Sequence, residues 1–310
     1  MARKVKKSSY NTIQSGTHIR GKWHDHRYIV KKRLGEGAIG SVYLCSMNGR
    51  NVALKISEKN TSITIEVNVL KALQKVQGNK LGPSLYDVDD WVAQDGKTYS
   101  YYVMEYIQGM GMHSFIRRYG NQWVGPFLLQ LLNDLEALHQ AGWVFGDLKL
   151  DNVLIDIKPP RVRLVDVGGT TQVGRSIKEY TEFYDRGYWE LGSRKAEPSY
   201  DLFAVVMIFI HVFYPNRFEK RGDSFALLNR KIAAIPSLKP YRACFYKALK
   251  GVYQKSADMR EDIIYIMANH PSSSRSIQQK LPFWRRTTPL ECISIGMITL
   301  SAYGVAWLFT

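Results

Sequence analysis

The sequence predicts an α+β protein of two lobes, a small β-rich lobe followed by a larger and mostly helical one, with a transmembrane helix at the C-terminus. From residue 17 to 106 the apolar positions come in short alternating runs, which are typical of paired strands. Within residues 107–270, the expected larger lobe, the stretch 122–140 repeats its apolar positions at helical spacing and predicts a long helix. From 289 to 310 the chain is apolar almost throughout, and this length suits a membrane span.

Two basic segments flank these lobes. Residues 1–16 are basic and aperiodic and are expected to form a flexible arm, whereas 271–288 form a Ser-rich, basic linker. The 310 residues include 43 Lys and Arg against 27 Asp and Glu, which gives a net charge of +16. This surplus favours an anionic partner, either nucleic acid or an acidic membrane surface, and does not decide between them.

The cysteines and the N-terminus indicate the compartment. Cys45, Cys244 and Cys292 are odd in number, scattered and without zinc-ligand spacing. Neither a disulfide framework nor a cysteine metal site is therefore expected, and a reducing cytoplasm is consistent with this. The opening MARKVKKSS leads into no apolar core, so no signal peptide is expected.

The C-terminal segment predicts a single-pass tail anchor in the cell membrane. Residues 292–309 carry no charge, whereas a buried globular helix, the alternative, usually keeps a polar face. Lys280, Arg285 and Arg286 precede the segment and no charge follows it, which places the lobes in the cytoplasm. Small residues along it favour helix pairing and hence a homodimer: Gly296, Ala302 and Ala306.

A glycine-rich stretch begins the small lobe. Gly35, Gly37 and Gly40 have GxGxxG spacing, and Val42 follows two residues later. Glycines in such a loop let the backbone approach phosphate oxygens and donate N–H groups to them. A dinucleotide-binding motif would need a helix directly afterwards. Here a strand, an Asn48-Gly49 turn and another strand follow, so we expect a hairpin with a glycine-rich tip.

Lys55 and Glu66 are expected to form an ion pair. Lys55 ends the run VALK on the second strand of that hairpin, and Glu66 shares the apolar face of the next helix with Leu70 and Leu73. A carboxylate on an apolar face is costly to bury without a partner. The alternative is a surface glutamate on an ordinary helix.

The run VFGDLKLDNVL, residues 144–154, places Asp147, Lys149 and Asn152 between two apolar segments. Asp166 follows the next apolar strand. A carboxylate, a cation and an amide on a short rigid loop suit phosphoryl transfer, in which catalysis is mostly positioning and charge stabilisation. Asp166 is expected to hold Mg²⁺, which prefers carboxylate and amide oxygens. The alternative is a polar turn between a helix and a strand.

Two further features are a strand between the lobes and a pair of histidines. The strand SYYVMEY leads from one lobe to the other, and the backbone between Glu105 and Ile107 is expected to hydrogen-bond a purine base. His24 and His26 stand at a predicted turn between strands. Two histidines at this spacing suit a metal ion, but no third ligand is nearby in the sequence, so a solvated turn is expected.

Together these motifs resemble the eukaryotic-like (Hanks-type) protein kinases in order and spacing, over residues 17–270. The resemblance implies the two-lobed kinase fold, protein substrates, and ATP and Mg²⁺ as cofactors. Lys149, two residues after the aspartate, resembles the serine/threonine branch. The stretches FGDLK, DVGGTT and IKEYTEFYDRGYW resemble most closely the YabT-type family of short sporulation kinases. That likeness implies a cytoplasmic kinase domain, a C-terminal membrane anchor, DNA as an activating partner, and a role in sporulation or DNA maintenance.

The resemblance also implies a role for each site residue. Asp147 would orient the substrate hydroxyl and accept its proton, and Lys149 would steady the transferring phosphate. Asn152 and Asp166 would hold Mg²⁺. The ATP-binding set would be Gly35, Gly37, Gly40, Val42, Lys55 and Glu66 for the phosphates, and Glu105 and Ile107 for the base. Asp201 would support the catalytic loop from beneath, and either Glu190 or Glu197 would close the activation segment.

Three residues depart from the family pattern. Phe145 and Gly146 replace the usual His-Arg before the aspartate, and Val167 replaces an aromatic residue. Since that arginine normally captures an activation-loop phosphate, activity is expected not to require such a latch. The departures leave two alternatives, a pseudokinase that acts as a membrane-tethered DNA or protein scaffold, and a small-molecule kinase. The retained Lys55 and Asp147 argue against the first, and the lysine at position 149 argues against the second.

Overall fold

The computed structural model describes residues 13–36, 40–75 and 82–269. The chain divides into two units, Met1–Met267 and Ala268–Thr310, and the first holds nearly all of the described residues. Most of the predicted basic arm, the linker and the predicted anchor at 289–310 lie outside the described ranges. Within those ranges, no helix combines the length and the apolar character that crossing a membrane requires.

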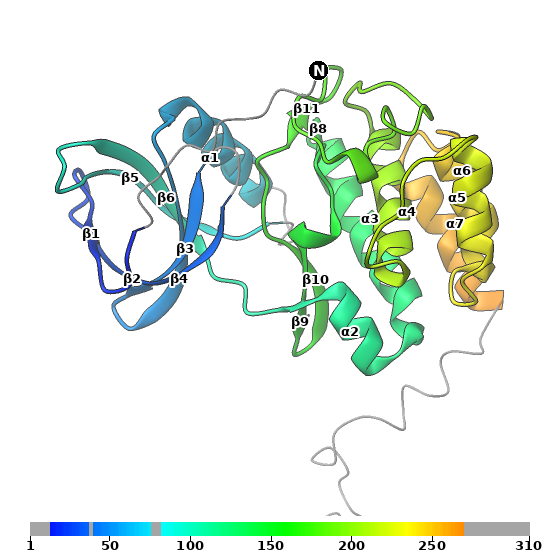
Figure 1. Cartoon of the computed structure of the whole chain (residues 1–310), viewed down its shortest axis with the longest axis horizontal. Coiled ribbons are helices and arrows are strands. Elements are labelled where there is room, and N and C mark those ends of the chain that lie inside the picture. Colours follow the sequence, from blue (N-terminus) through cyan, green and yellow to red (C-terminus); the bar gives the residue numbers. More distant parts are fainter. Residues whose placement is uncertain (1–12, 37–39, 76–81, 270–310) are drawn as a thin grey trace, which may run out of the picture. The chain divides into compact units, whose positions relative to one another are not determined.

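The small lobe is a six-stranded antiparallel sheet with one helix, α1, inserted between its fourth and fifth strands (Figure 1). The strands run in the order β1-β2-β3-β4-β6-β5 across the sheet. The elements are β1 (His18–Arg20), β2 (Arg27–Glu36), β3 (Ser41–Met47), β4 (Arg50–Ser57), α1 (Asn60–Lys75), β5 (Leu85–Val92) and β6 (Thr98–Glu105).

Sequence periodicity explains this sheet. Side chains that alternate along β2, β3, β4 and β6 fill one compact core, which includes Tyr28, Tyr43, Leu54 and Tyr101. The β3–β4 hairpin turns at Asn48 and Gly49, whose φ angles of 49° and 81° are those that an Asn-Gly hairpin turn needs. The hairpin brings Lys55 directly opposite Val42 on the neighbouring strand, and Val42 lies opposite Gly35 on the next.

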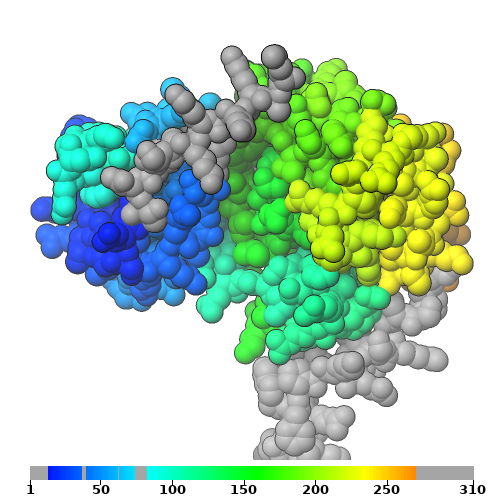
Figure 2. All heavy atoms as spheres, viewed as in Figure 1, coloured from blue at the N-terminus to red at the C-terminus, as the bar shows by residue number. Residues whose placement is uncertain are grey.

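The large lobe is mainly helical and carries two short sheets, β7-β9-β10 and β8-β11. Figure 2 shows it in green and yellow beside the blue and cyan small lobe. Its helices are α2 (Met112–Tyr119), α3 (Val124–Gln140), α4 (Pro198–Phe213), α5 (Ser224–Ala233), α6 (Arg242–Leu249) and α7 (Ser256–Asn269). Its strands are β7 (Met110–Gly111), β8 (Trp143–Val144), β9 (Val153–Ile157), β10 (Pro160–Leu164) and β11 (Thr171–Gln172).

Helix α4 forms the centre of this lobe. Every residue from Ser199 to Val212 is buried, which is the pattern of a helix that is apolar on all sides and enclosed by its neighbours. Helix α3, predicted over 122–140, begins at Val124 and ends at Gln140. Gly142 follows with φ 82° and turns the chain into β8 and the loop that carries Asp147.

Candidate active site

The loop between β8 and β9 carries three predicted residues in one contact network. The Asp147 side chain is 17% exposed, and its Oδ2 accepts a hydrogen bond from Lys149 Nζ. Asn152 Nδ2 donates to the Asp147 backbone oxygen at 3.2 Å. The amide nitrogen offers no lone pair to a cation, so Oδ1 is the atom of Asn152 that suits one. The loop therefore directs a carboxylate, an ammonium and an amide toward one region.

Asp201, at the start of α4, holds this loop from within the core. Its side chain is fully buried and accepts hydrogen bonds from the backbone N–H groups of Phe145, at 2.7 Å, and Gly146, at 3.0 Å. His139 Nε2 lies 2.9 Å from the same carboxylate. A buried carboxylate needs several donors. This one uses the backbone directly before Asp147, so the position of the catalytic loop depends on α4.

Gly146 is required by geometry. Its φ of 80° lies in the left-handed region, and a Cβ at this position would stand 2.5 Å from the backbone oxygen of Gly169. Gly169 is equally restricted, because its Cβ would lie 2.7 Å from that of Asp147. The two glycines let the catalytic loop and the segment after Asp166 approach closely, which excludes an arginine at 146 in this conformation.

Phe145 and Val167 both belong to the main hydrophobic core, with 1% and 2% of their surface exposed. These two of the three departures from the family pattern are thus packed residues, one larger and one smaller than usual. The loop is fixed by packing and by Asp201.

Lys55 and Glu66 form the predicted ion pair, with Nζ and Oε2 separated by 2.7 Å and both side chains buried. Lys55 Nζ also lies 3.3 Å from Asp166 Oδ1. Tyr102 donates to the same Glu66 oxygen at 2.7 Å. Burial opposes the charged form of Lys55, but the carboxylates of Asp166 and Glu66 outweigh it and raise the pKa of the ammonium. Lys55 is therefore charged and held between α1 and Asp166.

Asp166 and Asn152 suit a hard divalent cation. Val165 N donates to Asn152 O at 3.0 Å, so the two candidate ligands come from adjoining backbone. The Asp166 side chain is 46% exposed, and Gly168 N donates to its Oδ1 at 3.0 Å. An accessible carboxylate beside an amide oxygen is the donor set that Mg²⁺ prefers.

The nucleotide-binding residues are only partly described. Gly37 lies outside the described ranges. Gly40 is packed so closely that a Cβ would stand 2.3 Å from the Ile56 oxygen, whereas a Cβ at Gly35 would meet nothing within 4 Å. The Glu105 N–H already donates to Ser84 O at 2.8 Å, which restricts its role in base binding to the carbonyl oxygen. Ile107 follows, largely buried, at the start of the large lobe.

Arg163 on β10 contacts the segment between the lobes and was not predicted. Its Nη2 lies 2.9 Å from Glu105 Oε2, and its Nη1 lies 3.3 Å from Asp156 Oδ2. Since 58 residues separate Arg163 from Glu105, no local pattern in the sequence indicates the pair.

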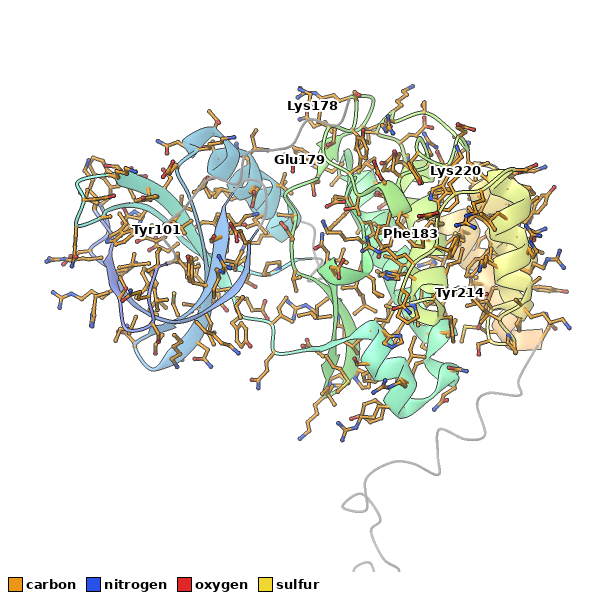
Figure 3. The ribbon with its side chains drawn as sticks, in the orientation of Figure 1. Tyr101, Lys178, Glu179, Phe183, Tyr214 and Lys220 are labelled. Atoms are coloured by element: carbon orange, nitrogen blue, oxygen red, sulfur yellow. The ribbon has the colours of Figure 1, made fainter. Side chains whose placement is uncertain are left out.

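Two residues of the activation segment also reach the site. Thr181 Oγ1 donates to Asp147 Oδ1 at 2.9 Å. Glu179 stands on the same segment beside α1 (Figure 3), and its pKa is raised by burial and by the negative charges of Glu66 and Asp166. Because 34 residues separate Thr181 from Asp147, no local pattern in the sequence indicates this contact.

The end of the activation segment is held by Glu197. This residue precedes α4 and pairs with the buried Arg186 at 2.6 Å, and Arg186 also donates to Ser199 Oγ at 2.8 Å. Glu190, the alternative, is 80% exposed and contacts Lys220 on the surface. Of the two alternatives, Glu197 is the one that forms the ion pair with the buried Arg186.

Comparison with known proteins agrees with this arrangement. The family model described as protein kinase domain matches residues 28–281, which is well over half of the chain. The chain therefore belongs to the protein kinase family.

The chain is 44% identical over 272 residues to the serine/threonine-protein kinase YabT of Bacillus subtilis. The aligned region covers 87% of this chain and 79% of that protein. It is 30% identical over 172 residues to the serine/threonine-protein kinase ppk31 of Schizosaccharomyces pombe, covering 51% of this chain and 15% of that one. It is thus a Hanks-type bacterial kinase similar to YabT, and an ATP-dependent serine/threonine kinase.

Gly146→Ala is expected to lower kinase activity on the order of 100-fold, because the new methyl group forces the catalytic loop away from Gly169. Gly142→Ala is the matched control, since Gly142 has φ 82° but no atom within 4 Å of a Cβ. The control carries only the strain of the left-handed backbone, about 1–2 kcal/mol. Equal initial rates for the two variants would show that kinase activity does not depend on the close approach of the two loops.

Proposed function

We propose that Asp147 is the catalytic carboxylate of this kinase, that Lys149 supports the transferring phosphoryl group, and that Asn152 and Asp166 hold Mg²⁺ against the ATP phosphates. The observation that carries the proposal is the convergence of two groups of charged residues. Asp201 of α4 holds the backbone directly before Asp147, and the Asn152–Val165 hydrogen bond ties the loop of Asp147 to the residues that join β10 to Asp166.

Phosphoryl transfer depends on positioning and on stabilising charge. Asp147 has its two oxygens held by Thr181 and Lys149, so the direction of the carboxylate is fixed before a substrate binds. Each carboxylate oxygen has a further lone pair, to which a serine or threonine hydroxyl of a protein substrate donates its hydrogen bond. The proton of that hydroxyl passes to Asp147 as the oxygen attacks.

The remaining residues serve the nucleotide. Lys55 is kept charged and in place by Glu66, and its ammonium is available to the ATP phosphates. Mg²⁺, when bound, neutralises charge on those phosphates. The glycine loop supplies backbone N–H groups, and the carbonyl of Glu105 and the backbone of Ile107 hold the base.

We further propose that the kinase is tail-anchored in the cell membrane with its catalytic domain in the cytoplasm. The support is the uncharged run of residues 292–309 after a basic linker. The net charge of +16 and the Lys and Arg residues between positions 3 and 33 support stimulation by DNA or another polyanion through phosphate contacts. The likeness to sporulation kinases supports a role in sporulation or DNA maintenance, and the small residues of the tail support a homodimer.

Transfer from labelled ATP to a generic protein substrate tests the catalytic assignment. With the full chain and Mg²⁺, Asp147→Asn is expected to lower the rate at least about 100-fold. Asp151→Asn, which changes a 67% exposed carboxylate on the same loop, is the matched control and should retain activity. If Asp147→Asn keeps the wild-type rate, Asp147 is not the catalytic carboxylate; if neither chain transfers phosphate, the chain acts as a scaffold.

The same assay, run with and without duplex DNA across a salt titration, tests the polyanion. DNA is expected to raise the rate, with an apparent affinity that falls steeply and linearly in log salt. An effect that stays constant across the titration would contradict phosphate contacts.

Membrane fractionation tests the anchor. The wild-type chain is expected to remain in membranes after alkaline extraction, whereas a variant with Ile298→Arg and Val305→Arg should be released, because each arginine costs about 2.5–3.5 kcal/mol at a helix centre. Equal release of both chains would refute the anchor.

A further inference from the structure

The two edges of the small-lobe sheet meet at the turn between β1 and β2. Strands β1 and β5 stand at opposite ends of the strand order, yet Lys22 N donates to Asp90 O at 2.8 Å. The backbone N–H groups of Trp23 and His24 donate to the buried Asp89 carboxylate, the second at 2.8 Å. The sheet therefore curls until the turn rests on β5, around the core that contains Tyr101 (Figure 3).

This contact brings two histidines of the turn onto a third side chain. His24 Nδ1 lies 2.7 Å from Asp87 Oδ1, and His26 Nδ1 lies 2.9 Å from Asp87 Oδ2. One donor atom from each of the three residues falls within 4.8 Å of the others. Asp87 is the third ligand that the sequence around His24 and His26 lacks, and it comes from a strand about 60 residues further on.

The separations suit a small divalent ion. With zinc–ligand bonds of about 2.0–2.1 Å, neighbouring ligands of a tetrahedral site stand roughly 3.3 Å apart. The present hydrogen bonds of 2.7 and 2.9 Å end on different oxygens of Asp87, and the three donor atoms lie within 4.8 Å of one another, so a shared ion requires the imidazoles to shift. The two histidine side chains are 53% and 56% exposed, which leaves them room to do so. This exposure also leaves room for water as a fourth ligand.

The surroundings of Asp87 hold it as a ligand. Its side chain is only 6% exposed, and it accepts further hydrogen bonds from Tyr28 OH at 2.6 Å and from Val88 N at 2.9 Å. Outer donors of this kind orient metal-binding carboxylates in proteins. The charge of the neighbouring Asp89 also favours a cation.

The turn is rigid without the histidine side chains. Asp89 binds its backbone, and a Cβ at Gly21 would stand 2.3 Å from the Asp89 carboxylate, so only glycine permits this approach. Gly21 N donates to His26 O at 2.9 Å across the turn. Because the backbone is already fixed, an ion would need to order only two imidazole rings.

We propose that His24, His26 and Asp87 bind a first-row divalent transition-metal ion, with Zn²⁺ as the expected occupant. Imidazole nitrogen combined with carboxylate oxygen suits Zn²⁺ better than Mg²⁺ or Ca²⁺, which take oxygen ligands. The Nδ1 lone pairs bind the ion, and the protons that these nitrogens share with Asp87 leave to Nε2 or to solvent. The ion joins the β1–β2 turn to β5 and thereby closes the small lobe.

The contacts of these three side chains in the described ranges include none with Lys55, Asp147 or Asp166. The proposal does not depend on the catalytic assignment.

Zinc binding to the untagged full chain tests the site. The chain is stripped of metal, carries Asp166→Asn to disable the magnesium ligand, and is titrated with Zn²⁺ in the presence of excess Mg²⁺. We expect one equivalent of Zn²⁺ per chain and an increase in Tm. The double variant His24→Gln with His26→Gln should lose affinity at least 10-fold and lose the shift in Tm, whereas the control His18→Gln on β1 should keep both.

Co²⁺ provides a second readout, since tetrahedral coordination gives visible absorption that the double variant should lack. In the background with Asp166 intact, the double variant should keep the basal Mg²⁺-dependent kinase activity, which shows that it folds. Equal uptake of Zn²⁺ by the wild type and the double variant, or no uptake at micromolar Zn²⁺, would overturn the proposal.

Discussion

The hydrogen bonds that the Asp201 carboxylate accepts from the backbone of Phe145 and Gly146 are the constraint on which the catalytic loop depends. The carboxylate is enclosed by α4 and α3, so it cannot exchange these donors for water, and removing one would leave a buried charge unsatisfied. Gly146, the residue directly before Asp147, donates its N–H to this carboxylate with a backbone φ of 80°. A side chain buried in the core thus fixes the position of the loop that carries Asp147.

Ion pairs connect the small lobe to this part of the large lobe. Glu66 on α1 holds Lys55 on β4, and Lys55 reaches Asp166. The residue before Asp166, Val165, is hydrogen-bonded to Asn152 in the loop that carries Asp147. The chain of contacts runs from α4 through the catalytic loop to the sheet. Thr181 adds the activation segment to the same carboxylate, Asp147. Each of these contacts is short and partly buried, which favours one arrangement of the two lobes around the nucleotide.

The sequence predicted those parts in which a local pattern has a single physical solution. The pair Asn48-Gly49 predicted a hairpin turn, and Glu66 on an apolar helix face predicted a cationic partner, which is Lys55. The family resemblance supplied the role of Asp201. The pairing of His24 and His26 with Asp87, and of Arg163 with Glu105, was beyond prediction because it depends on how far the sheet curls and how distant strands align. The close approach of Gly146 to Gly169 could not be predicted from the sequence for the same reason.

The departures at Phe145, Gly146 and Val167 now have a physical reading. A Cβ at 146 would collide with the backbone of Gly169, so this conformation excludes an arginine there, and a loop held by packing is consistent with the prediction that activity requires no phosphate-dependent latch. Regulation is then expected at the proposed polyanion-binding surface and the proposed membrane anchor.

The measurement that tests this account most directly is the time course of phosphate transfer by the full chain after phosphatase treatment, with intact mass confirming that no phosphate remains. A loop fixed by Asp201 and by packing predicts product formation that is linear from the first time point. A lag that shortens with enzyme concentration and disappears after preincubation with ATP would contradict it, because activity would then require prior phosphorylation.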